Sequence, residues 1–353
     1  MIPKHKHTQK LCVQIKRQIA TLKAQIEEER KRRKTGRNLW FIEKHGAAQL
    51  ILAGFTKSGK SSIISRITNA KPTISDYPFT TVEPVAGMLP YQDIAFQLVE
   101  VPSFQPTLGN STWNLRVLGL IRNADGLILT LNLQEDPCWQ FNFVRKILEN
   151  SKILVEKPKA RVVVERKNVG LGIQVLGRLL DGTYEDVKQL LNSYKIYNAT
   201  VKIYGEATLD DVEDAIFEGV VYKPTLILAN KIDLKNSNEK LENLKRMVEG
   251  KIRILSVSCK TGEGLEKLGF EIFSLLDILR VYTKHPAKKE PSTEPIILKN
   301  SSTVLDVAKE IHSSLYKKFG YAKIWGPSAK YEGEKVGGDH MLMDGDIVEI
   351  HSK

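Results

Sequence analysis

Cysteine is scarce in this sequence, and long apolar runs are missing. Among 353 residues there are three cysteines, Cys12, Cys138 and Cys259. They form no Cys-x-x-Cys pair and no cluster with histidine, which excludes a disulfide framework and a zinc site of the usual spacing. No apolar run approaches the ~18 residues of a membrane-spanning helix. Residues 11–20, which follow a basic start, are too charged for a signal-peptide core, so we expect a cytoplasmic protein without membrane contact.

The signatures of several other functional classes are absent as well. No Ser/His/Asp set or pair of carboxylates indicates a hydrolytic site of those kinds. No helix-turn-helix, zinc motif or aromatic tract supports a sequence-specific nucleic-acid binder. The composition, 42% apolar and 27% charged, is ordinary for a soluble chain with room for two or three domains.

Positive charge is concentrated at the amino end, in a segment that we bound at residues 1–45. The first 40 residues hold twelve Lys and Arg against three acidic residues, so nine of the twelve net positive charges fall there. A basic face on a helix suits the phosphate backbone of a nucleic acid. The alternative is a solvated helix that packs its apolar stripe on the main domain. The two interpretations are compatible, because one concerns the basic face of the helix and the other its apolar face. The apolar residues that predict this amphipathic helix are Leu11, Ile15, Ile19, Leu22 and Ile26.

A glycine-rich motif, GFTKSGKS from Gly54 to Ser61, follows an apolar stretch and matches the phosphate-binding P-loop. Gly54 and Gly59 let successive backbone N–H groups curl around a polyphosphate, because no Cβ interferes. We expect Lys60 to reach the β- and γ-phosphates and Ser61 to offer its hydroxyl to Mg²⁺. The predicted phosphate-binding residues are Gly54, Thr56, Lys57, Ser58, Gly59, Lys60, Ser61 and Ser62.

A second motif, NKID, ends a wholly apolar strand about 170 residues after the P-loop. The Asp233 carboxylate can accept both the N1–H and the exocyclic amine of guanine, a pair of donors that adenine does not present. Lys231 is expected to pack over the base, and Asn230 to tie neighbouring loops together. These residues select GTP over ATP. A further base-contacting loop is predicted at Ser258, Cys259 and Lys260.

Alternating strand and helix patterns predict an α/β fold with a mostly parallel sheet for residues 46–151 and 223–282. Residues 152–222 have a different texture and are predicted to form an inserted small α+β module. The nucleotide domain is predicted to have strands 48–53, 94–101, 125–132, 225–230 and 253–258, and helices 60–68, 112–123, 239–247 and 264–280. The insertion is predicted to have strands 161–166 and 200–205, a hairpin-like stretch at 168–177, and helices 184–194 and 209–217.

The carboxyl-terminal part, residues 283–353, begins with a linker rich in Pro, Lys and Glu. After it we predict a strand at 296–298, a helix at 304–319, a strand at 322–325 and a turn-rich stretch. This order is typical of a compact β-grasp fold. Its charges nearly cancel, which favours a surface for a partner over a basic groove.

Taken together, these motifs resemble the developmentally regulated GTP-binding (DRG) proteins of the Obg-related GTPase group. The resemblance covers nearly the whole chain: a basic helical start, a P-loop GTPase core, an inserted module and a C-terminal TGS domain. The stretches that carry it are SDYPFTTVEPVAG (75–87), YKIYNATVKIYGEATLDD (194–211), LRVYTK (279–284) and YAKIWGPSAKYEGEKVGGDHMLMDGDIVEI (321–350).

The resemblance implies that Thr81, in the first switch segment, completes the coordination of Mg²⁺ together with Ser61 when GTP is bound. It further implies a slow, Mg²⁺-dependent GTPase that acts as a translation factor associated with ribosomes or RNA. The basic amino-terminal segment and the TGS domain are the regions expected to contact them. Family members often have a stabilising partner protein, so a partner is expected here too.

The second switch motif departs from the pattern of the family. Related GTPases carry Asp-x-Pro-Gly, whereas this chain has Glu100, Val101, Pro102 and Ser103. Glu is one methylene longer than Asp, and a misplacement of about 1 Å can cost roughly a hundredfold in rate. The predicted catalytic residues are Lys60, Thr81, Glu100 and Ser103. The alternative function is a GTP-binding scaffold that has lost hydrolysis.

Two further residues bear on hydrolysis. Phe104 is apolar, as in the group that lacks a catalytic Gln, so no side chain there orients the attacking water. Lys57 stands where potassium-activated relatives carry a cation-coordinating Asn or Asp. Its ammonium either takes the place of K⁺, which makes turnover independent of K⁺, or faces solvent without a catalytic role.

Overall fold

The computed structural model describes residues 42–69, 84–104, 112–158, 160–167, 172–216, 220–286 and 290–352. Residues 1–43 and 44–353 are separate units. The amphipathic helix predicted within residues 1–45, with its apolar residues at 11–26, lies outside the described residues. Thr81 lies outside them as well, and both expectations stay predictions.

A six-stranded sheet in the order β11-β10-β4-β1-β3-β2 forms the centre of the nucleotide domain. All neighbours are parallel except β2, which pairs antiparallel with β3. The inner strands β1, β4 and β10 are buried along their whole length, as expected of apolar runs covered on both faces. The strands are β1 (Ala48–Gly54), β2 (Val85–Tyr91), β3 (Ile94–Glu100), β4 (Gly126–Asn132), β10 (Thr225–Asn230) and β11 (Arg253–Val257).

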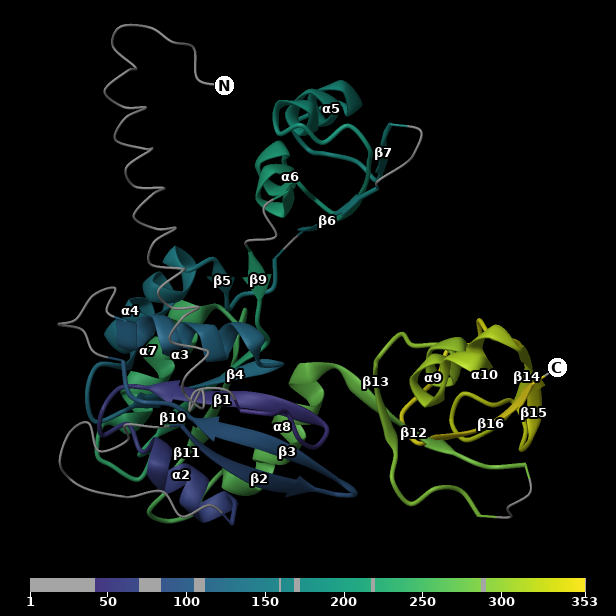
Figure 1. The fold of residues 1–353 in the computed structure, drawn as a ribbon. Helices are drawn as coiled ribbons and strands as arrows, with labels where there is room; N and C mark the ends of the chain where they lie inside the picture. The colour runs from purple at the N-terminus through teal and green to yellow at the C-terminus, as the bar shows by residue number, and fades with distance from the viewer. Residues whose placement is uncertain are drawn as a thin grey trace, which may run out of the picture. The chain divides into compact units, whose positions relative to one another are not determined.

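Helices cover both faces of this sheet. Figure 1 shows α3, α4 and α7 on one side and α2 and α8 on the other. Ile63 and Ile64 of α2 share one apolar core with Leu268 and Ile272 of α8, because each helix turns its apolar stripe to the strands. The helices are α2 (Lys60–Ile67), α3 (Thr112–Asn123), α4 (Pro137–Asn150), α7 (Ser237–Val248) and α8 (Leu268–Leu276). β2 and α4 are not predicted from the apolar periodicity of the sequence.

The insertion forms a three-stranded sheet in the order β6-β8-β7, with its own apolar core. The predicted hairpin at 168–177 is wrong for its described part, because β7 is not paired with β6 and lies parallel to β8. A parallel pair needs a crossover, and α5 supplies it. At the base of the insertion, β5 (Ile153–Leu154) pairs with β9 (Val221–Tyr222), so entry and exit lie side by side. The other elements are β6 (Ala160–Arg166), β7 (Ile173–Leu176), α5 (Tyr184–Ser193), β8 (Ala199–Gly205) and α6 (Leu209–Ile216).

A second, five-stranded sheet in the order β13-β12-β16-β14-β15 forms the carboxyl-terminal domain. Val304 and Val307 of α9 pack on its inner face, with Val281 and Val348 of the strands. The sheet and its helices correspond to the predicted β-grasp fold. Its elements are β12 (Ile278–Thr283), β13 (Ile296–Lys299), α9 (Val304–Ile311), α10 (Ser313–Lys317), β14 (Phe319–Trp325), β15 (Glu334–Val336) and β16 (Asp346–Ser352).

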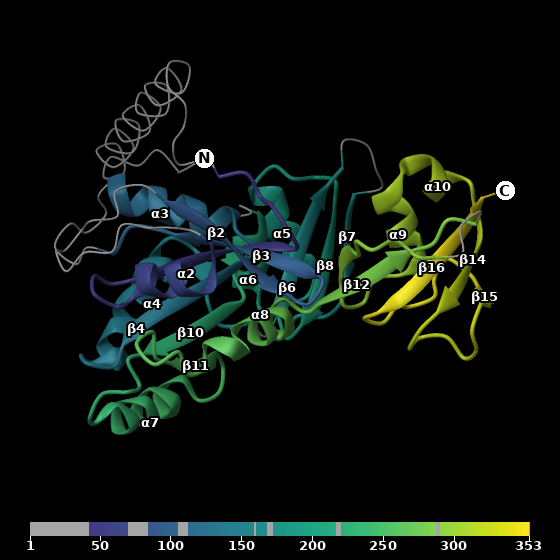
Figure 2. The same ribbon diagram turned by 90° about the horizontal axis from the view of Figure 1, so that it is seen from below.

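Two predicted helices are shorter than their apolar periodicity suggested. The helix expected at 264–280 starts as a 3₁₀ turn (Leu265–Lys267) and ends at Leu276, where Asp277 takes a left-handed conformation with φ of 52°. The chain continues at once into β12, as Figure 2 shows. The helix expected at 304–319 breaks at His312, whose backbone is extended. After α8, the β12 strand of the β-grasp sheet takes residues that also fit a helical pattern, whereas after His312 the second short helix α10 follows.

Candidate nucleotide-binding site

Those predicted site residues that the structure describes meet at the carboxyl edge of the six-stranded sheet. β1 ends at Gly54, β3 at Glu100 and β10 at Asn230, and these strands run in the same direction. The loops that follow them therefore converge. In open α/β sheets this edge is where ligands bind.

The backbone of the P-loop requires glycine at two positions. At Gly54, a Cβ would lie 2.4 Å from the carbonyl oxygen of Thr130. At Gly59, where φ is +96°, a Cβ would lie 2.1 Å from Asn230 Nδ2. Lys57 is also left-handed, with φ of 58°, and its side chain is exposed. The loop thus approaches neighbouring strands so closely that side chains cannot be added at either glycine.

Lys60 is buried at the centre of the loop, with 5% of its surface exposed. Its Nζ donates to the carbonyl oxygen of Phe55 at 2.8 Å and to Ser103 Oγ at 2.8 Å. Burial lowers the pKa of Lys60 to about 8, against the opposing effect of the nearby Glu100 charge. The ammonium predicted to hold phosphate is therefore poised over the loop and in contact with the second switch motif.

Ser61 and Glu100 meet directly. Ser61 Oγ donates to Glu100 Oε1 at 2.5 Å, and Glu100 is 1% exposed. The extra methylene of Glu, relative to Asp, brings its carboxylate to the serine predicted to bind Mg²⁺. Two oxygen donors side by side suit this hard cation, which takes few protein ligands and fills its shell with phosphate oxygens and water. Within the described residues, no group of three or more His, Cys, Asp or Glu is placed to hold a metal ion alone.

Asn230 joins three loops, as the sequence predicted. Its Nδ2 donates to the carbonyl oxygen of Ser58 in the P-loop at 2.8 Å. Its Oδ1 accepts from the backbone N–H of Lys231 at 2.8 Å and of Cys259 at 3.3 Å. Asn230 is 1% exposed, so these bonds are shielded from water. The phosphate loop and the two base-recognition segments are thereby held as one unit.

Asp233 is held by the second base-contacting loop. Ser258 Oγ donates to Asp233 Oδ1 at 2.6 Å, and Ser258 is fully buried. This bond fixes the direction of the carboxylate at the rim, where Asp233 is exposed. Cys259 is partly buried, and burial raises the pKa of its thiol to about 11, which leaves it neutral. Lys260 is exposed beside it.

Two residues of the site were missed by sequence reasoning. Arg66 of α2 donates to the carbonyl oxygens of Cys259 at 2.6 Å, Lys260 at 3.2 Å and Thr261 at 3.4 Å, and so fastens the second base loop to the P-loop helix. Gln134 accepts from Lys231 Nζ at 3.1 Å through Oε1. Neither belongs to a motif, and only the basic last turn of α2 was visible as a signal for Arg66.

The remaining predicted residues lie around this centre. Thr56 and Ser62 are half-buried, and Ser58 donates through Oγ to the carbonyl oxygen of Phe55 at 2.9 Å. Phe104, directly after the second switch motif, is 1% exposed, and its backbone N–H donates to the carbonyl oxygen of Gly54 at 3.1 Å. Its ring is therefore a core residue and presents no polar group to the site.

Comparison with known proteins identifies three successive regions. Residues 49–167 match a family model described as 50S ribosome-binding GTPase. Residues 170–278 match the C-terminal region of the MMR_HSR1 domain. Residues 279–352 match the TGS domain. The third match begins within β12, the strand that follows α8.

Full-length relatives extend these matches. The chain is 34% identical to an uncharacterized GTP-binding protein of Methanocaldococcus jannaschii, over 99% of this chain and 88% of that protein. It is 30% identical to an uncharacterized GTP-binding protein of Halobacterium salinarum, over 99% of this chain and 94% of that protein. It is 29% identical to human developmentally-regulated GTP-binding protein 2, over 99% and 95%.

The chain belongs to the DRG family of GTPases. The resemblance stated from the sequence is confirmed, and with it the P-loop GTPase fold and the C-terminal TGS domain. Among the described helices of this DRG protein, none combines the length and apolar character needed to cross a bilayer.

Proposed function

We propose that this DRG protein binds GTP with Mg²⁺ and hydrolyses it slowly. The observation that carries the proposal is the hydrogen bond of 2.8 Å from Asn230 to Ser58, which joins a phosphate loop to a guanine-recognition motif. Calorimetric titration of the full chain with GTP and with ATP in magnesium buffer tests it. We expect heat with GTP and at least a hundredfold weaker binding of ATP. Equal binding of the two nucleotides would refute it.

The residues divide the work of binding. Lys60 and the backbone N–H groups at the start of α2 stabilise the phosphates, because a cation and the positive end of a helix dipole face them. Ser61 and Glu100 would hold Mg²⁺, which when bound neutralises phosphate charge and orients the terminal phosphate. Thr81 is proposed as a further ligand. Asp233 accepts from the base, and Gln134 steers Lys231 toward the face of the base.

Slow hydrolysis follows from what surrounds the terminal phosphate. Lys60 contacts Ser103, so the second switch motif lies within reach of the ammonium that stabilises the leaving charge. Phe104 is buried and places no amide or carboxylate beside an attacking water. Positioning by Thr81 and Ser103, with charge stabilisation by Lys60, is the catalysis that the proposal assigns.

The alternative is a scaffold that binds GTP without hydrolysing it. The contact between Glu100 and Ser61 favours it, because Glu100 is one methylene longer than the Asp of the family motif and its carboxylate is engaged with the serine assigned to the metal. Single-turnover hydrolysis by the wild type and by the double variant Glu100→Asp, Ser103→Gly separates the two functions. If both are inert while both bind GTP, the scaffold is correct. A measurable wild-type rate establishes the GTPase.

We further propose that the protein acts in translation, through contacts of its basic amino-terminal segment and TGS domain with ribosomes or RNA, in the cytoplasm. The charge of residues 1–40 supports this, as does the description of the matching family model. A stabilising partner protein is part of the same proposal.

Co-sedimentation of the full chain with ribosomes at two salt concentrations tests these contacts. Binding that weakens steeply with salt, and that is lost when Arg30, Arg32 and Arg33 are changed to Glu, is expected. Absence of the chain from the ribosomal pellet at low salt would refute it.

A further inference from the structure

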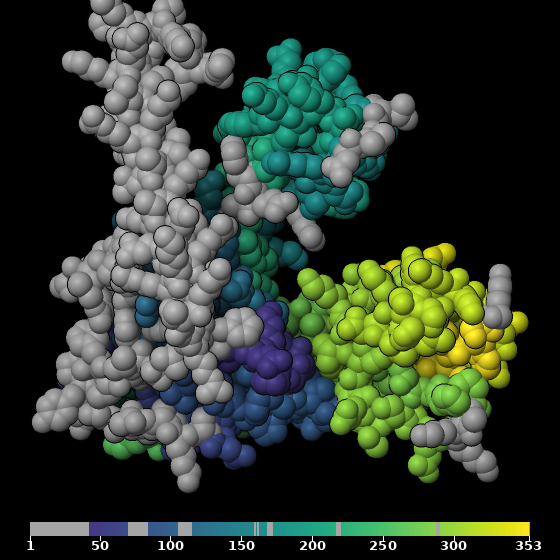
Figure 3. All heavy atoms as spheres, viewed as in Figure 1, coloured from purple at the N-terminus to yellow at the C-terminus, as the bar shows by residue number. Residues whose placement is uncertain are grey.

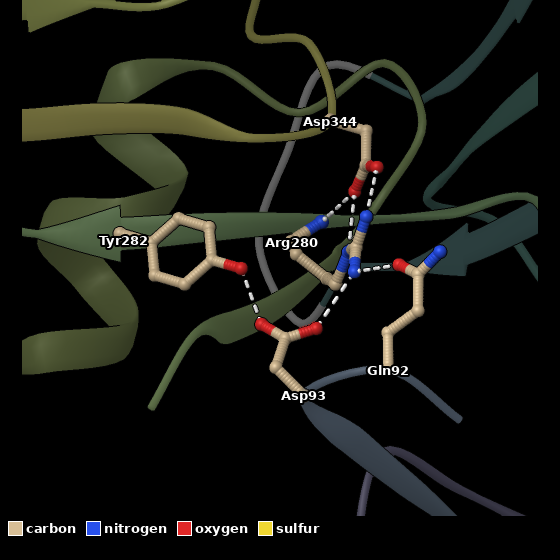
Figure 4. Close-up of polar contacts among 5 residues, drawn as sticks. All are labelled: Gln92, Asp93, Arg280, Tyr282 and Asp344. Atoms are coloured by element: carbon tan, nitrogen blue, oxygen red, sulfur yellow. Dashed lines mark hydrogen bonds and ion pairs between the residues drawn. The ribbon is translucent and has the colours of Figure 1, made fainter. Parts of the chain in front are cut away.

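The tip of the β2–β3 hairpin is fastened to the TGS domain by an arginine. Arg280, on β12, donates through Nη1 to Asp93 Oδ1 at 2.7 Å and also to Gln92 (Figure 4). The same guanidinium donates two hydrogen bonds to the Asp344 carboxylate, from Nε to Oδ1 at 3.0 Å and from Nη2 to Oδ2 at 2.7 Å. The hydroxyl of Tyr282 donates to the second oxygen of Asp93. We call these five residues the Arg280 clasp.

The clasp is partly shielded from water. The side chain of Arg280 is 14% exposed, and its guanidinium lies 5.3 Å from the ring centre of Phe273 on α8. The atoms of the hairpin adjoin those of the TGS domain in the space-filling view (Figure 3). Although burial alone raises the pKa of Asp93, the hydrogen bonds from Tyr282 and Arg280 bring it below its ordinary value. Burial likewise raises the pKa of Asp344, but the hydrogen bonds from Arg280 bring it below its ordinary value, so both carboxylates stay charged at neutral pH.

The turn at the tip of the hairpin, Gln92 and Asp93, lacks the residues that such tight turns usually favour. Tyr91 pairs with Ile94, which leaves Gln92 and Asp93 as a two-residue turn. Such turns favour Asn-Gly or Asp-Gly, because residues in them take positive φ. Gln92 has φ of 52°, a left-handed conformation that is unfavourable for a residue with a Cβ. Both turn residues contact Arg280, which accounts for their presence.

The opposite end of β3 contacts the phosphate loop. β3 runs from Ile94, next to Asp93, to Glu100, and over seven residues it spans about 23 Å. Glu100 accepts from Ser61, and Ser103 accepts from Lys60. A terminal phosphate held by Lys60 competes with Ser103 for that ammonium. One rigid strand thus has the γ-phosphate side of the nucleotide site at one end and the TGS domain at the other.

We propose that the Arg280 clasp couples the nucleotide site to the TGS domain through β3. The proposal rests on the GTP binding proposed above. GTP has the terminal phosphate that competes with Ser103 for Lys60, and GDP lacks it. The two nucleotides therefore act differently on the end of β3, and the clasp transmits this difference to β12. Coupling between two sites is reciprocal, so weakening the clasp is expected to change the ratio of the affinities for GTP and GDP.

The test measures the dissociation constants of GDP and of a non-hydrolysable GTP analogue on the full chain. Asp93→Asn and Arg280→Gln each weaken the clasp: the first removes the carboxylate charge and one acceptor, and the second removes the guanidinium. Lys284→Gln is the matched control, because it breaks an ion pair with Glu349 inside the TGS domain. We expect each clasp variant to change the ratio of the two constants about three- to tenfold in the same direction. The double variant is expected to change it no further, and the control to leave it unaltered.

The outcomes are distinct. Ratios within twofold of the wild type in both clasp variants, with normal binding of each nucleotide, would overturn the coupling and leave the proposed function intact. Failure of the wild type to bind either nucleotide would overturn the proposed function and the coupling with it. Arg280→Gln also loses the hydrogen bonds to Asp344. If that variant does not fold, Asp93→Asn alone tests the coupling, because Asp93 lies in an exposed turn and the side-chain contacts that the structure describes for it are those of the clasp.

Discussion

Replacing Asp233 by Asn provides the sharpest test of guanine recognition. The carboxylate offers two acceptors to the base, and Asn keeps one acceptor while presenting a donor to the exocyclic amine. A hydrogen bond to a charged group contributes about 1.5–3 kcal/mol, and two donors facing one another add to the loss. We expect a total of about 2–4 kcal/mol, so GTP binds about 30- to 1,000-fold more weakly.

The structure also predicts which nucleotide the variant accepts. Xanthosine triphosphate carries an oxygen where guanine carries the amine, so the Asn amide can donate to it while its oxygen accepts from N1–H. Ser258 Oγ, now 2.6 Å from Asp233 Oδ1, donates equally well to the Asn oxygen, so the loop keeps its position. The assay is calorimetric titration of both nucleotides, with a thermal melt of each variant. Asp339→Asn, in the TGS domain, is the control that removes the same charge.

Two results would refute this reasoning. One is an Asp233→Asn variant that binds GTP within threefold of the wild type, which means that the carboxylate does not contact the base. The other is loss of both nucleotides together with a lower melting temperature, which means that Asp233 is needed for the loop rather than for the base. The control is expected to bind GTP as the wild type does.

Three further predictions concern the phosphate loop and its supports. Lys60 has a pKa of about 8 and binds phosphate when protonated, so GTP affinity should fall about tenfold between pH 7 and pH 9. Binding titrations across this range measure the fall. In the Lys60→Arg variant the affinity should not change over the same range, because arginine stays protonated. Arg66→Ala should weaken GTP binding roughly tenfold by freeing the Ser258–Lys260 loop, seen as faster amide exchange there, whereas unchanged exchange would contradict the role of Arg66. If the Lys57 ammonium takes the place of K⁺, hydrolysis should be equal within twofold in K⁺ and Na⁺, and a several-fold increase in K⁺ would argue against it.

Local patterns identified much of this molecule in advance. The P-loop and NKID motifs depend on short-range requirements, namely glycine where a loop approaches a strand and acceptors where guanine has donors. Fully apolar runs such as those of β4 and β10 predict buried parallel strands, because only strands covered on both faces need them. Each of these features can be predicted from one short, continuous segment of the sequence.

Periodicity misled where two structures satisfied the same pattern. Ile278–Arg280 fits the apolar spacing of α8, yet it forms the start of β12, because these residues pair with β13 and the rest of the strand pairs with β16. Ile173–Leu176 has the composition of a hairpin arm, yet it pairs in parallel with a strand that arrives after α5. Pairing partners are distant in sequence, so no local window contains the information that decides between these outcomes.

The sequence alone determined the nucleotide class and the order of the domains, because both follow from motifs whose chemistry is complete within a few residues. The tertiary structure alone decided how those motifs are held: Arg66 on the second base loop, Gln134 on Lys231, and Arg280 between the β2–β3 hairpin and the TGS domain. An arginine or glutamine on a surface acquires a role only when folding brings an oppositely charged or hydrogen-bonding group within reach, and that proximity is a property of the whole chain.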